Sequence, residues 1–416
     1  MRGRRANEKG SLFIHFIRVM QKIIRSLLLS FILAAPAFAQ REIGTVNVAA
    51  DSRSLPVRVS ADTPELNALA LQAFRSHGRY RLVASGYLFD IRFASLGGDR
   101  VRVDVARGLD GAAIASEVAT GTSPRNALLA AADAAVARTN GLGLRGYFTS
   151  KIAFIGERTG HKEIYVSDLF FGDVRQITHD RAIALTPRWS PDGEKLLYTS
   201  YYRSGFPDIY EIDLAGYQRT TFVSFKGTNT GARFSPDGRQ VAMVLTGEGS
   251  SEIYVSNAQG RGVSRRTRSE SAKASPVWSP DGSRLAFTME PGPQIYVMSA
   301  GGGYPQRVTS GISRYCAEPD WSRADPNKIA FTMATGRNYQ IGVLDLARGQ
   351  GGQVSKAPFD GVEPCWLPDG RHLVYTARTA YTSRICILDT ETGKSTPISP
   401  TSFGPALQAN VWSVSR

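Results

Sequence analysis

Short apolar runs recur in a fixed order along residues 147–416. Residues 195–199 form one such run, and residues 208–214, Asp-Ile-Tyr-Glu-Ile-Asp-Leu, alternate apolar and polar positions. A period of two is typical of β-strands with one buried face. The same pair of runs returns four times, at residues 240–245 and 252–258, 284–289 and 294–300, 328–333 and 340–346, and 372–377 and 384–390. The pattern predicts a mainly β protein.

A turn motif precedes each apolar run. Residues 189–193 read Trp-Ser-Pro-Asp-Gly, and residues 278–282 repeat them. Proline fixes φ, aspartate bonds its own downstream backbone and glycine adopts positive φ, so the motif predicts a tight turn between two strands. The aromatic residues that open the motifs and their copies are Trp189, Phe234, Trp278, Trp321 and Trp366, at steps of 45, 44, 43 and 45 residues. Together with a weaker fourth strand, this period predicts four-stranded propeller blades.

The two ends of this region complement each other. Residues 151–155 and 163–169 supply the second and third strands of a blade that has no aromatic first strand, and residues 411–414, Val-Trp-Ser-Val, supply a first strand with nothing after it. We therefore expect a six-bladed β-propeller whose C-terminal strand closes the first blade, which leaves no long unpaired edge. A solenoid has a similar period, but it requires atypical capping repeats at both ends.

Residues 40–146 predict a small α+β domain before the propeller domain of residues 147–416. Thr63-Pro64 and Ser123-Pro124 are helix-start signals, and each precedes an apolar stripe at helical spacing. Between the helices we expect a strand at residues 80–84 and a hairpin that turns at residues 97–99. A docking role suits this module better than a catalytic one.

The N-terminal segment has the pattern of a secretory signal peptide. After Met20 come Lys22 and Arg25, an apolar core at residues 27–35 and the small-residue site Ala37-Phe38-Ala39. We expect cleavage after Ala39, because the core is too short for a permanent membrane anchor. Residues 1–19 fit no such segment and are interpreted as a spurious extension of the signal peptide at residues 1–39. The mature protein is expected to be exported and soluble.

Charge and cysteine content narrow the function classes. The chain carries a net charge of +14, but residues 40–416 hold 43 basic and 35 acidic residues, a net charge of +8. The basic residues are scattered, without the stripe typical of nucleic-acid binding. Cys316, Cys365 and Cys386 are odd in number, and the last two lie on the first and third strands of one blade, too far apart for a disulfide. We expect three buried or half-buried thiols.

Propeller topology groups residues that lie far apart in sequence. The loops that enter each first strand and those that join the second strand to the third emerge at one end of the blades. This geometry brings together the candidate partner-binding residues Asn229, Ser275, Tyr315, Glu318, Glu363, Tyr201, Tyr202, Phe206, Tyr339 and Tyr381. Tyrosines with a few charges around them are typical of protein interfaces. Packing between blades is the alternative role for each of them.

No catalytic, cofactor-binding or metal-binding set is recognisable in the sequence. The chain has no G-x-S-x-G motif, sialidase box, phosphate loop or zinc pair, and His161, His179 and His372 lack ligand spacing. We therefore expect a non-enzymatic protein without a cofactor. A sugar or small-ligand site, or an uncharacterised enzyme site, in the central channel stays open, because each blade can contribute one residue to it.

The combination of signal peptide, small α+β domain and W-S-P-D-G ring resembles the TolB family, the periplasmic component of the Tol-Pal system. Over residues 147–416 the resemblance rests on the S-P-D-G turns and on strands such as residues 164–169, Ile-Tyr-Val-Ser-Asp-Leu. Glu318-Pro319 and Glu363-Pro364 keep an E-P-x-W pattern at the strand openings, whereas Ser275 replaces the glutamate in the corresponding repeat.

The resemblance implies a monomeric periplasmic scaffold that binds a peptidoglycan-associated lipoprotein at one propeller face. It also implies contact with an inner-membrane Tol protein through the mature N-terminus, and a role in outer-membrane integrity and in envelope constriction during division. The mature start, Gln40-Arg41-Glu42-Ile43-Gly44, departs from the family's N-terminal pattern.

Overall fold

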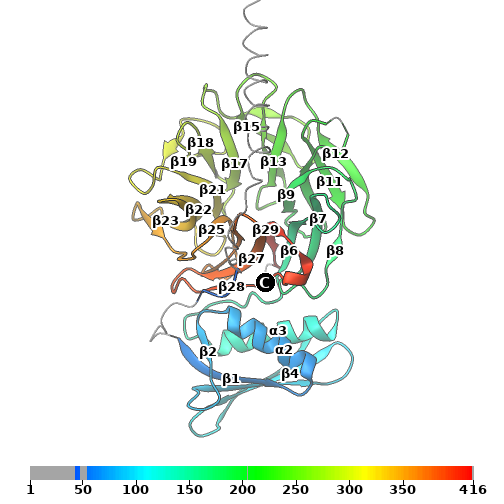
Figure 1. Ribbon diagram of the computed structural model, residues 1–416, viewed down its shortest axis with the longest axis vertical. Helices are drawn as coiled ribbons and strands as arrows, with labels where there is room; N and C mark the ends of the chain where they lie inside the picture. The colour runs from blue at the N-terminus through cyan, green and yellow to red at the C-terminus, as the bar shows by residue number, and fades with distance from the viewer. Residues whose placement is uncertain (1–42, 47–53, 204, 415–416) are drawn as a thin grey trace, which may run out of the picture. The chain divides into compact units, whose positions relative to one another are not determined.

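The computed structural model describes residues 43–46, 54–203 and 205–414. The predicted signal peptide and the first residues of the mature chain lie outside these ranges. β-strands are the main regular structure of the described chain, and they form six four-stranded blades and one separate five-stranded sheet (Figure 1).

The six blades are antiparallel. Five of them use their strands in chain order from the middle of the ring outward, and the remaining blade begins with the C-terminal strand. Blade 1 contains β29 (Ala406–Trp412), β6 (Lys151–Gly156), β7 (Glu163–Asp168) and β8 (Arg175–Gln176); blade 2 contains β9 (Ala184–Trp189), β10 (Lys195–Ser200), β11 (Asp208–Asp213) and β12 (Arg219–Val223); blade 3 contains β13 (Asn229–Phe234), β14 (Gln240–Leu245), β15 (Glu252–Asn257) and β16 (Ser264–Arg265). Blade 4 contains β17 (Lys273–Trp278), β18 (Arg284–Met289), β19 (Gln294–Ser299) and β20 (Gln306–Arg307); blade 5 contains β21 (Cys316–Trp321), β22 (Lys328–Thr335), β23 (Asn338–Asp345) and β24 (Gln350–Gln353); blade 6 contains β25 (Asp360–Trp366), β26 (His372–Arg378), β27 (Ser383–Asp389) and β28 (Ser395–Pro397). The six-bladed propeller expected from the sequence is confirmed.

The repeated turn motif forms because its side chains bond its own backbone. In the first copy, Ser190 Oγ lies 2.5 Å from Asp192 Oδ1, and the same carboxylate oxygen accepts a hydrogen bond from the N–H of Glu194 over 3.0 Å. Gly193 has φ of 77°, a value that only glycine adopts without strain. The motif is therefore a self-contained turn between the first and second strands of a blade.

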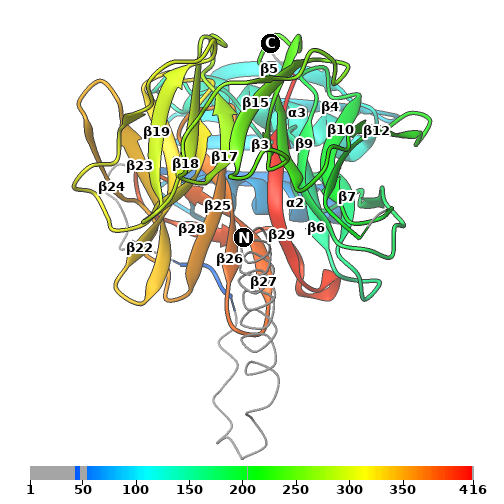
Figure 2. The ribbon, with the colours of Figure 1, turned by 90° about the horizontal axis from the view of Figure 1, so that it is seen from above.

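The C-terminal strand closes the ring, as predicted. Strand β29 pairs antiparallel with β6, and the two strands lie side by side in Figure 2. The register differs by one residue from the sequence interpretation, because Val411, and not Trp412, lies opposite Ile152 at the position that the aromatic residue occupies in the other blades. The indole of Trp412 instead reaches blade 2, where Nε1 donates to the carbonyl of Pro191 over 3.0 Å.

Each first strand contains a bulge with a left-handed residue. The pairing between first and second strands shifts register at the same place in all six blades. The bulge residues, with φ between 51° and 65°, are Thr186, Gly231, Ser275, Glu318, Glu363 and Gln408. Since non-glycine residues avoid this region, five strained positions at one level of the ring mark a feature that the surrounding bonds must hold in place.

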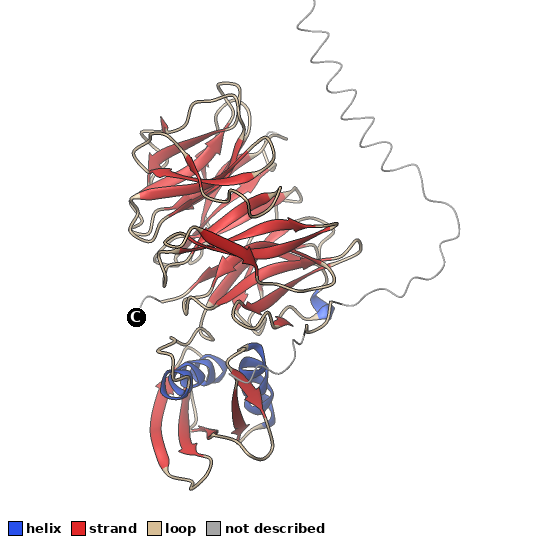
Figure 3. Cartoon of the chain, turned by 90° about the vertical axis from the view of Figure 1, so that its left-hand side faces the viewer, coloured by secondary structure: helices blue, strands red, loops and turns tan. Residues whose placement is uncertain are grey.

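The separate sheet belongs to the α+β module, and two helices contact it (Figure 3). Its strand order is β2-β1-β3-β4-β5, with β1 (Leu55–Ala61), β2 (Tyr80–Leu82), β3 (Phe89–Ser95), β4 (Arg100–Arg107) and β5 (Ala113–Thr120). The helices α2 (Pro64–Ser76) and α3 (Pro124–Thr139) begin at the predicted caps, where Thr63 and Ser123 accept hydrogen bonds from the backbone. Strands β1 and β5 were not predicted from the sequence.

The module and the propeller share one hydrophobic cluster. Phe148 packs 5.6 Å from Phe74 of α2 and 5.9 Å from Phe170, which follows β7, measured between ring centroids. Beside this contact, Arg125 of α3 forms an ion pair with Asp168 at the end of β7, with 2.6 Å between Nε and Oδ2. Apolar burial and a half-buried ion pair therefore hold the module against blade 1.

Candidate functional site

The loops of the propeller lie at two ends of the blades. Loops between second and third strands, and those from each fourth strand to the next first strand, lie at one end, which we name the loop face. The turns between first and second strands, and between third and fourth strands, lie at the other end, the turn face. All the candidate residues predicted from the sequence belong to loops or strand ends at the loop face or to the bulge level just inside it.

Large apolar side chains are exposed on the loop face. Tyr202, Phe206 and Tyr381, which the sequence analysis named, are exposed to 48%, 67% and 76%. Ile183 and Phe225, which it missed, are exposed to 47% and 50%. A single apolar residue inside a loop has no periodic signal, so sequence reasoning could not find these two. Apolar groups from four loops at one end are typical of a protein-binding surface.

Tyr202 is held in place from below by a charge network. The guanidinium carbon of Arg219 lies 3.8 Å from the centroid of the Tyr202 ring, a cation–π contact. Arg219 is in turn ion-paired with the buried carboxylate of Asp180, which also accepts a hydrogen bond from Ser200 Oγ over 2.9 Å. Tyr201, next to Tyr202, is half-buried, and its N–H donates to the carbonyl of Ile183. The exposed ring is therefore preorganised, which reduces the entropy lost on binding.

Tyr315 and Tyr339 form the wall of a hollow on the same face. Their rings meet edge to face with 5.0 Å between centroids. The hollow has a volume of about 330 Å³ and also contains the side chains of Arg314 and Arg337. Burial, and next the charge of Glu318, raises the pKa of Tyr315 to about 12, so its hydroxyl keeps its proton at neutral pH. The hollow offers aromatic surface with two cations at its edge.

A second hollow on the loop face was not expected. It has a volume of about 350 Å³ and lies between the loop that follows β6 and the loop that leads to β9. Its lining residues are Glu157, Gly160, His161, Lys162, Arg181, Ala182 and Ile183. His161 therefore contributes to a surface depression of mixed charge.

Asn229 and Ser275 differ from the exposed residues. Asn229 is completely buried, and its amide bonds both the N–H and the carbonyl of Phe225, over 3.1 and 2.8 Å. It shapes the loop that displays Phe225 and cannot itself reach a partner in this conformation. Ser275 is half-buried at a bulge of β17, with φ of 52°.

Glu318 and Glu363 lie inside strands, at the bulges of β21 and β25, and not in the preceding loops as the sequence suggested. Glu318 Oε2 accepts hydrogen bonds from Thr332 Oγ1 (2.6 Å) and from the N–H of Glu363 (3.1 Å). Glu363 accepts from Thr376 Oγ1 (2.8 Å) and from Nε2 of Gln408 (2.7 Å). The two carboxylates connect blades 5, 6 and 1 and satisfy the strained bulge backbone. Burial, followed by repulsion from Glu363, raises the pKa of Glu318.

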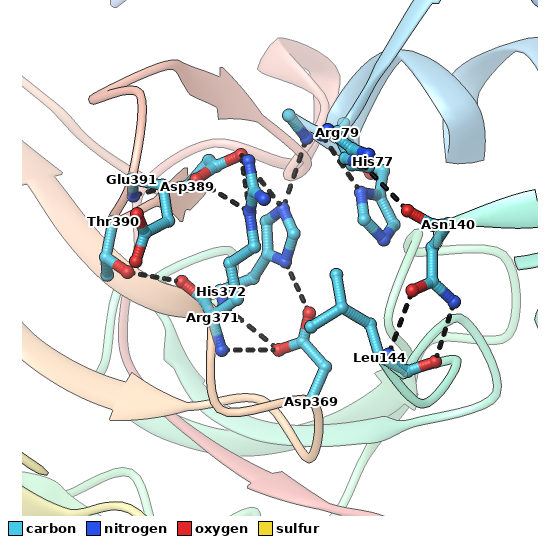
Figure 4. A network of polar contacts seen from close by, with 12 residues as sticks. His77, Arg79, Asn140, Leu144, Asp369, Arg371, His372, Asp389, Thr390 and Glu391 are labelled. Carbon is cyan, nitrogen blue, oxygen red and sulfur yellow. Dashed lines mark hydrogen bonds and ion pairs between the residues drawn. The ribbon is translucent and has the colours of Figure 1, made fainter. Parts of the chain in front are cut away.

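A buried polar junction lies on the turn face, where the α+β module meets blade 6 (Figure 4). His77, after α2, stacks against Tyr147 and meets His372 of β26 with 4.3 Å between ring centroids. His372 Nδ1 lies 2.5 Å from Asp369 Oδ2, and its Nε2 lies 3.5 Å from Asp389 Oδ2. Sequence reasoning treated His372 as isolated, because nothing in the pattern connects it with a residue 295 positions earlier.

The hydrogen bonds of this junction do not suit a metal ion. His77, Asp369 and His372 place potential ligand atoms within 4.8 Å of one another. However, His77 Nδ1 accepts from the N–H of Arg79 (3.2 Å), so its Nε2 carries the proton, and His372 Nε2 accepts from the N–H of Gly78 (3.1 Å) while its Nδ1 is engaged with Asp369. A metal-binding nitrogen must be free of its proton, so both rings would have to give up these bonds. The geometry favours a proton-binding cluster.

The three cysteines are free and buried, as expected from their spacing. Burial, and next the nearby Asp320 carboxylate, raises the pKa of Cys365 to about 11, and burial raises the pKa of Cys386 to about 12. Because the thiolate is the reactive form, these two thiols are structural groups rather than nucleophiles.

With this geometry established, comparison with known proteins identifies the family. A family model described as PD40, TolB beta propeller domain, matches residues 141–416. The chain belongs to this family. A Protein TolB homolog of Chlorobium luteolum is 35% identical over 163 residues, which cover 39% of this chain and 37% of the relative. The Tol-Pal system protein TolB of Desulfosudis oleivorans is 41% identical over 127 residues, covering 30% of this chain and 28% of the relative. The matched segments thus span only 37% and 28% of the length of these relatives.

Solved structures extend the similarity in fold. TolB from Acinetobacter baumannii has a TM-score of 0.75 and 21% identity, and the match covers 89% of this chain and 98% of that chain. The Nidogen/Laminin complex also matches, with a TM-score of 0.54, 13% identity and coverage of 64% of this chain. Since the ring occurs in proteins of such different names, function must be argued from the loop face and not from the fold. Among the described residues, no helix is long and apolar enough to cross a membrane.

Proposed function

We propose that this protein is a non-enzymatic scaffold of the Tol-Pal system in the periplasm. It binds a peptidoglycan-associated lipoprotein through the loop face and supports outer-membrane integrity and envelope constriction during division. Family membership and the Tol-Pal name of the Desulfosudis oleivorans relative support the system. Export rests on the signal-peptide pattern of residues 20–39, which stays a prediction.

The exposed aromatic surface is the observation that carries this proposal. Tyr202, Phe206 and Tyr381 reach into solvent from loops of blades 2 and 6, and Arg219 fixes the ring of Tyr202. Rigid aromatic side chains contribute large contact area with little loss of entropy, which is why binding energy concentrates on them. Glu318 and Glu363 act beneath this surface, by holding the bulges that shape it.

The mature N-terminus supports a second contact, with an inner-membrane Tol protein. Ile43 is 2% exposed and packs in the hydrophobic cluster that blades 5 and 6 share, and its carbonyl accepts a hydrogen bond from Arg384 Nη1 over 2.9 Å. Val46 exchanges two backbone hydrogen bonds with Ser395 of β28. Blade 6 also carries Tyr381 and Glu363, so occupancy of the loop face and release of this segment would act on the same sheet. We infer that the two binding events are linked in this way.

A binding assay with matched variants tests the loop face. The mature chain, residues 40–416, is titrated with the soluble domain of the lipoprotein beside a Tyr202→Ser/Phe206→Ser/Tyr381→Ser variant. We expect the variant to fold and to bind at least about 30-fold more weakly, the effect of losing one or more hot-spot aromatics. Tyr304→Ser is the control, because Tyr304 is 98% exposed but lies in a turn on the turn face. Equal binding by all three proteins would contradict the proposal.

A second assay tests the linkage to the N-terminus. Deletion of residues 40–50 removes Ile43 and Val46, which contact blade 6, and Ile43→Ser weakens the same contact without shortening the chain. Both changes should alter lipoprotein affinity in the same direction. The deletion should also abolish binding of the inner-membrane partner. If neither affinity changes, the two contacts are independent.

A further inference from the structure

A second ring of side chains lies two residues beyond the bulges, next to the propeller axis. The first strands of the six blades surround the middle of the ring (Figure 1). Their contributions to this axial ring are Arg188, Arg233, Val277, Asp320, Cys365 and Asn410. Arg233 Nη1 and Asp320 Oδ1 are 2.7 Å apart although they belong to blades 3 and 5, so these side chains reach past blade 4 toward each other.

The charges of the axial ring do not balance at Arg188. Asp320 neutralises Arg233, and its second oxygen accepts the N–H of Trp366 over 2.8 Å. Arg188 has one hydrogen bond, from Nη1 to the carbonyl of Pro187 (2.9 Å), and no ion pair within the described part of the chain. Burial, and next the like charge of Arg233, lowers the pKa of Arg188 to about 10. Such a lowered pKa reflects a cation held without a full counter-charge.

A second donor is fixed beside Arg188. Asn410 Oδ1 accepts the N–H of Trp189, the residue after Arg188, over 3.0 Å, which orients the amide between blades 1 and 2. Its Nδ2 points to Cys365 Sγ at 3.5 Å. A thiol sulfur is a weak acceptor, so this N–H is available for a better one.

We propose that the axial ring is a binding site for a carboxylate group, with Arg188 as its ion-pairing anchor and Asn410 Nδ2 as a second donor. A guanidinium matches the two oxygens of a carboxylate in a bidentate pair. The site provides one unneutralised positive charge, while Asp320 and Glu363 lie close enough to act on Arg188. A monoanion fits this balance, and a phosphate dianion does not. The carboxylate comes either from a free small acid or from an acidic side chain of a docked partner.

Thermal unfolding in sodium acetate tests the site directly. The full mature chain, Arg188→Met and Arg239→Met are compared in acetate and in chloride at equal ionic strength; Arg239 is a matched control because its side chain is 86% exposed. Acetate should raise the Tm of the wild type and of Arg239→Met, and this rise should be lost in Arg188→Met. Because the substitution removes a desolvated charge, Arg188→Met should fold. An equal response in all three proteins, or none in the wild type, would overturn the proposal, as would stabilisation by phosphate equal to that by acetate.

Chemical modification distinguishes the sources of the carboxylate. Phenylglyoxal reacts with arginine, and mass spectrometry follows Arg188 with Arg239 as the internal reference. Acetate should slow modification of Arg188 severalfold and leave Arg239 unchanged; unchanged modification of Arg188 contradicts the site. The lipoprotein domain, added without acetate, should give the same protection if the partner inserts an acidic side chain, and this arm alone rests on the proposed function. Protection by acetate but not by the lipoprotein domain identifies a free acid as the source of the carboxylate. This conclusion stands even if the lipoprotein does not bind.

Discussion

The backbone N–H of Gly78 donates to Nε2 of His372 over 3.1 Å, and so connects the end of α2 with blade 6. Glycine is required here by space and not by φ, because a Cβ atom at residue 78 would lie 1.7 Å from Asp389 Oδ2. Asp389 is itself held in place by a close ion pair with Arg371, 2.7 Å between Nη2 and Oδ2. The junction therefore depends on an approach of the α+β module that any side chain at residue 78 prevents.

Gly78→Ala should weaken the junction. The new methyl group must displace either the buried Asp389–Arg371 pair or the module, and overpacking of this kind costs about 1–3 kcal/mol. Gly301→Ala is the control, because its Cβ would meet only Ser299 Oγ at an ordinary 3.6 Å. Chemical denaturation should show a lower free energy of unfolding for Gly78→Ala alone. Equal stability of the two variants would show that the module is not held at this point.

The same junction predicts a pH dependence. Burial opposes a charge on His372, but Asp369 and Asp389 outweigh it and raise its pKa to about 9. Only the neutral ring offers the Nε2 lone pair that accepts the Gly78 N–H, so protonation exchanges this hydrogen bond for ion pairs with Asp369 and Asp389. A histidine pKa that is raised in the folded protein stabilises the folded state, and this stabilisation is fully present below the unfolded pKa of 6.5. The stabilisation, about 3 kcal/mol at most, is lost as pH rises toward 9.

Unfolding measured between pH 6 and pH 10 checks this dependence. His77, Tyr147, Arg371 and Lys394 also belong to the environment of the ring, and burial keeps the pKa of His77 low and that of Tyr147 high, so neither titrates in this window. His372→Gln should flatten the slope between pH 6.5 and pH 9. His161→Gln, on the loop face, should keep the wild-type slope. A wild-type slope in His372→Gln would rule out the histidine as its source.

Ring closure makes another prediction, at two equivalent glycines. Gly193 and Gly238 occupy the same place in the turn motif, with φ of 77° and 72°. Alanine at either costs about 1–2 kcal/mol for left-handed strain. At residue 193 its Cβ would also lie 2.3 Å from Trp412 Cε2, whereas at residue 238 it meets only Pro191 at 3.6 Å. Gly193→Ala should therefore lose more stability, by about a further 1–3 kcal/mol. Equal losses would show that Trp412 does not tighten the closure.

The fold was predictable because it repeats. The site was not predictable, since it depends on departures from that repeat. Five copies of one turn at a steady spacing predict blades, and the unmatched ends predict closure. Strand β5, Ala-Ile-Ala-Ser-Glu-Val-Ala-Thr, has alanines and Glu117 on its inner side, so its apolar alternation is weak. Strand β1 contains Pro56 near its start, which reads as a break.

The loop-face tyrosines could be predicted from topology alone, because loop position follows from strand order. The role of Glu318 and Glu363 could not, because E-P-x-W does not reveal a left-handed bulge that turns the carboxylates into the ring. Likewise, Trp412 is one residue out of phase with the other aromatic residues, and its contact with the blade 2 turn emerges only from the register of β29.

The carboxylate pair gives the last prediction. Burial and then the charge of Glu363 raise the pKa of Glu318, so the folded state binds this proton more tightly than the unfolded state does. The resulting stability is present below the unfolded pKa, about 4.5, and is lost as pH rises through the raised folded pKa. Glu363→Gln removes the repulsion while keeping a polar side chain for Thr376 and Gln408. It should reduce the loss of stability that begins above pH 4.5, well below the window of His372. Glu157→Gln, at an exposed ion pair with Lys162, is the control and should leave the profile unchanged. If Glu363→Gln leaves it unchanged too, the charge of Glu363 does not act on Glu318, and the bulges are held by the hydroxyl and amide bonds alone.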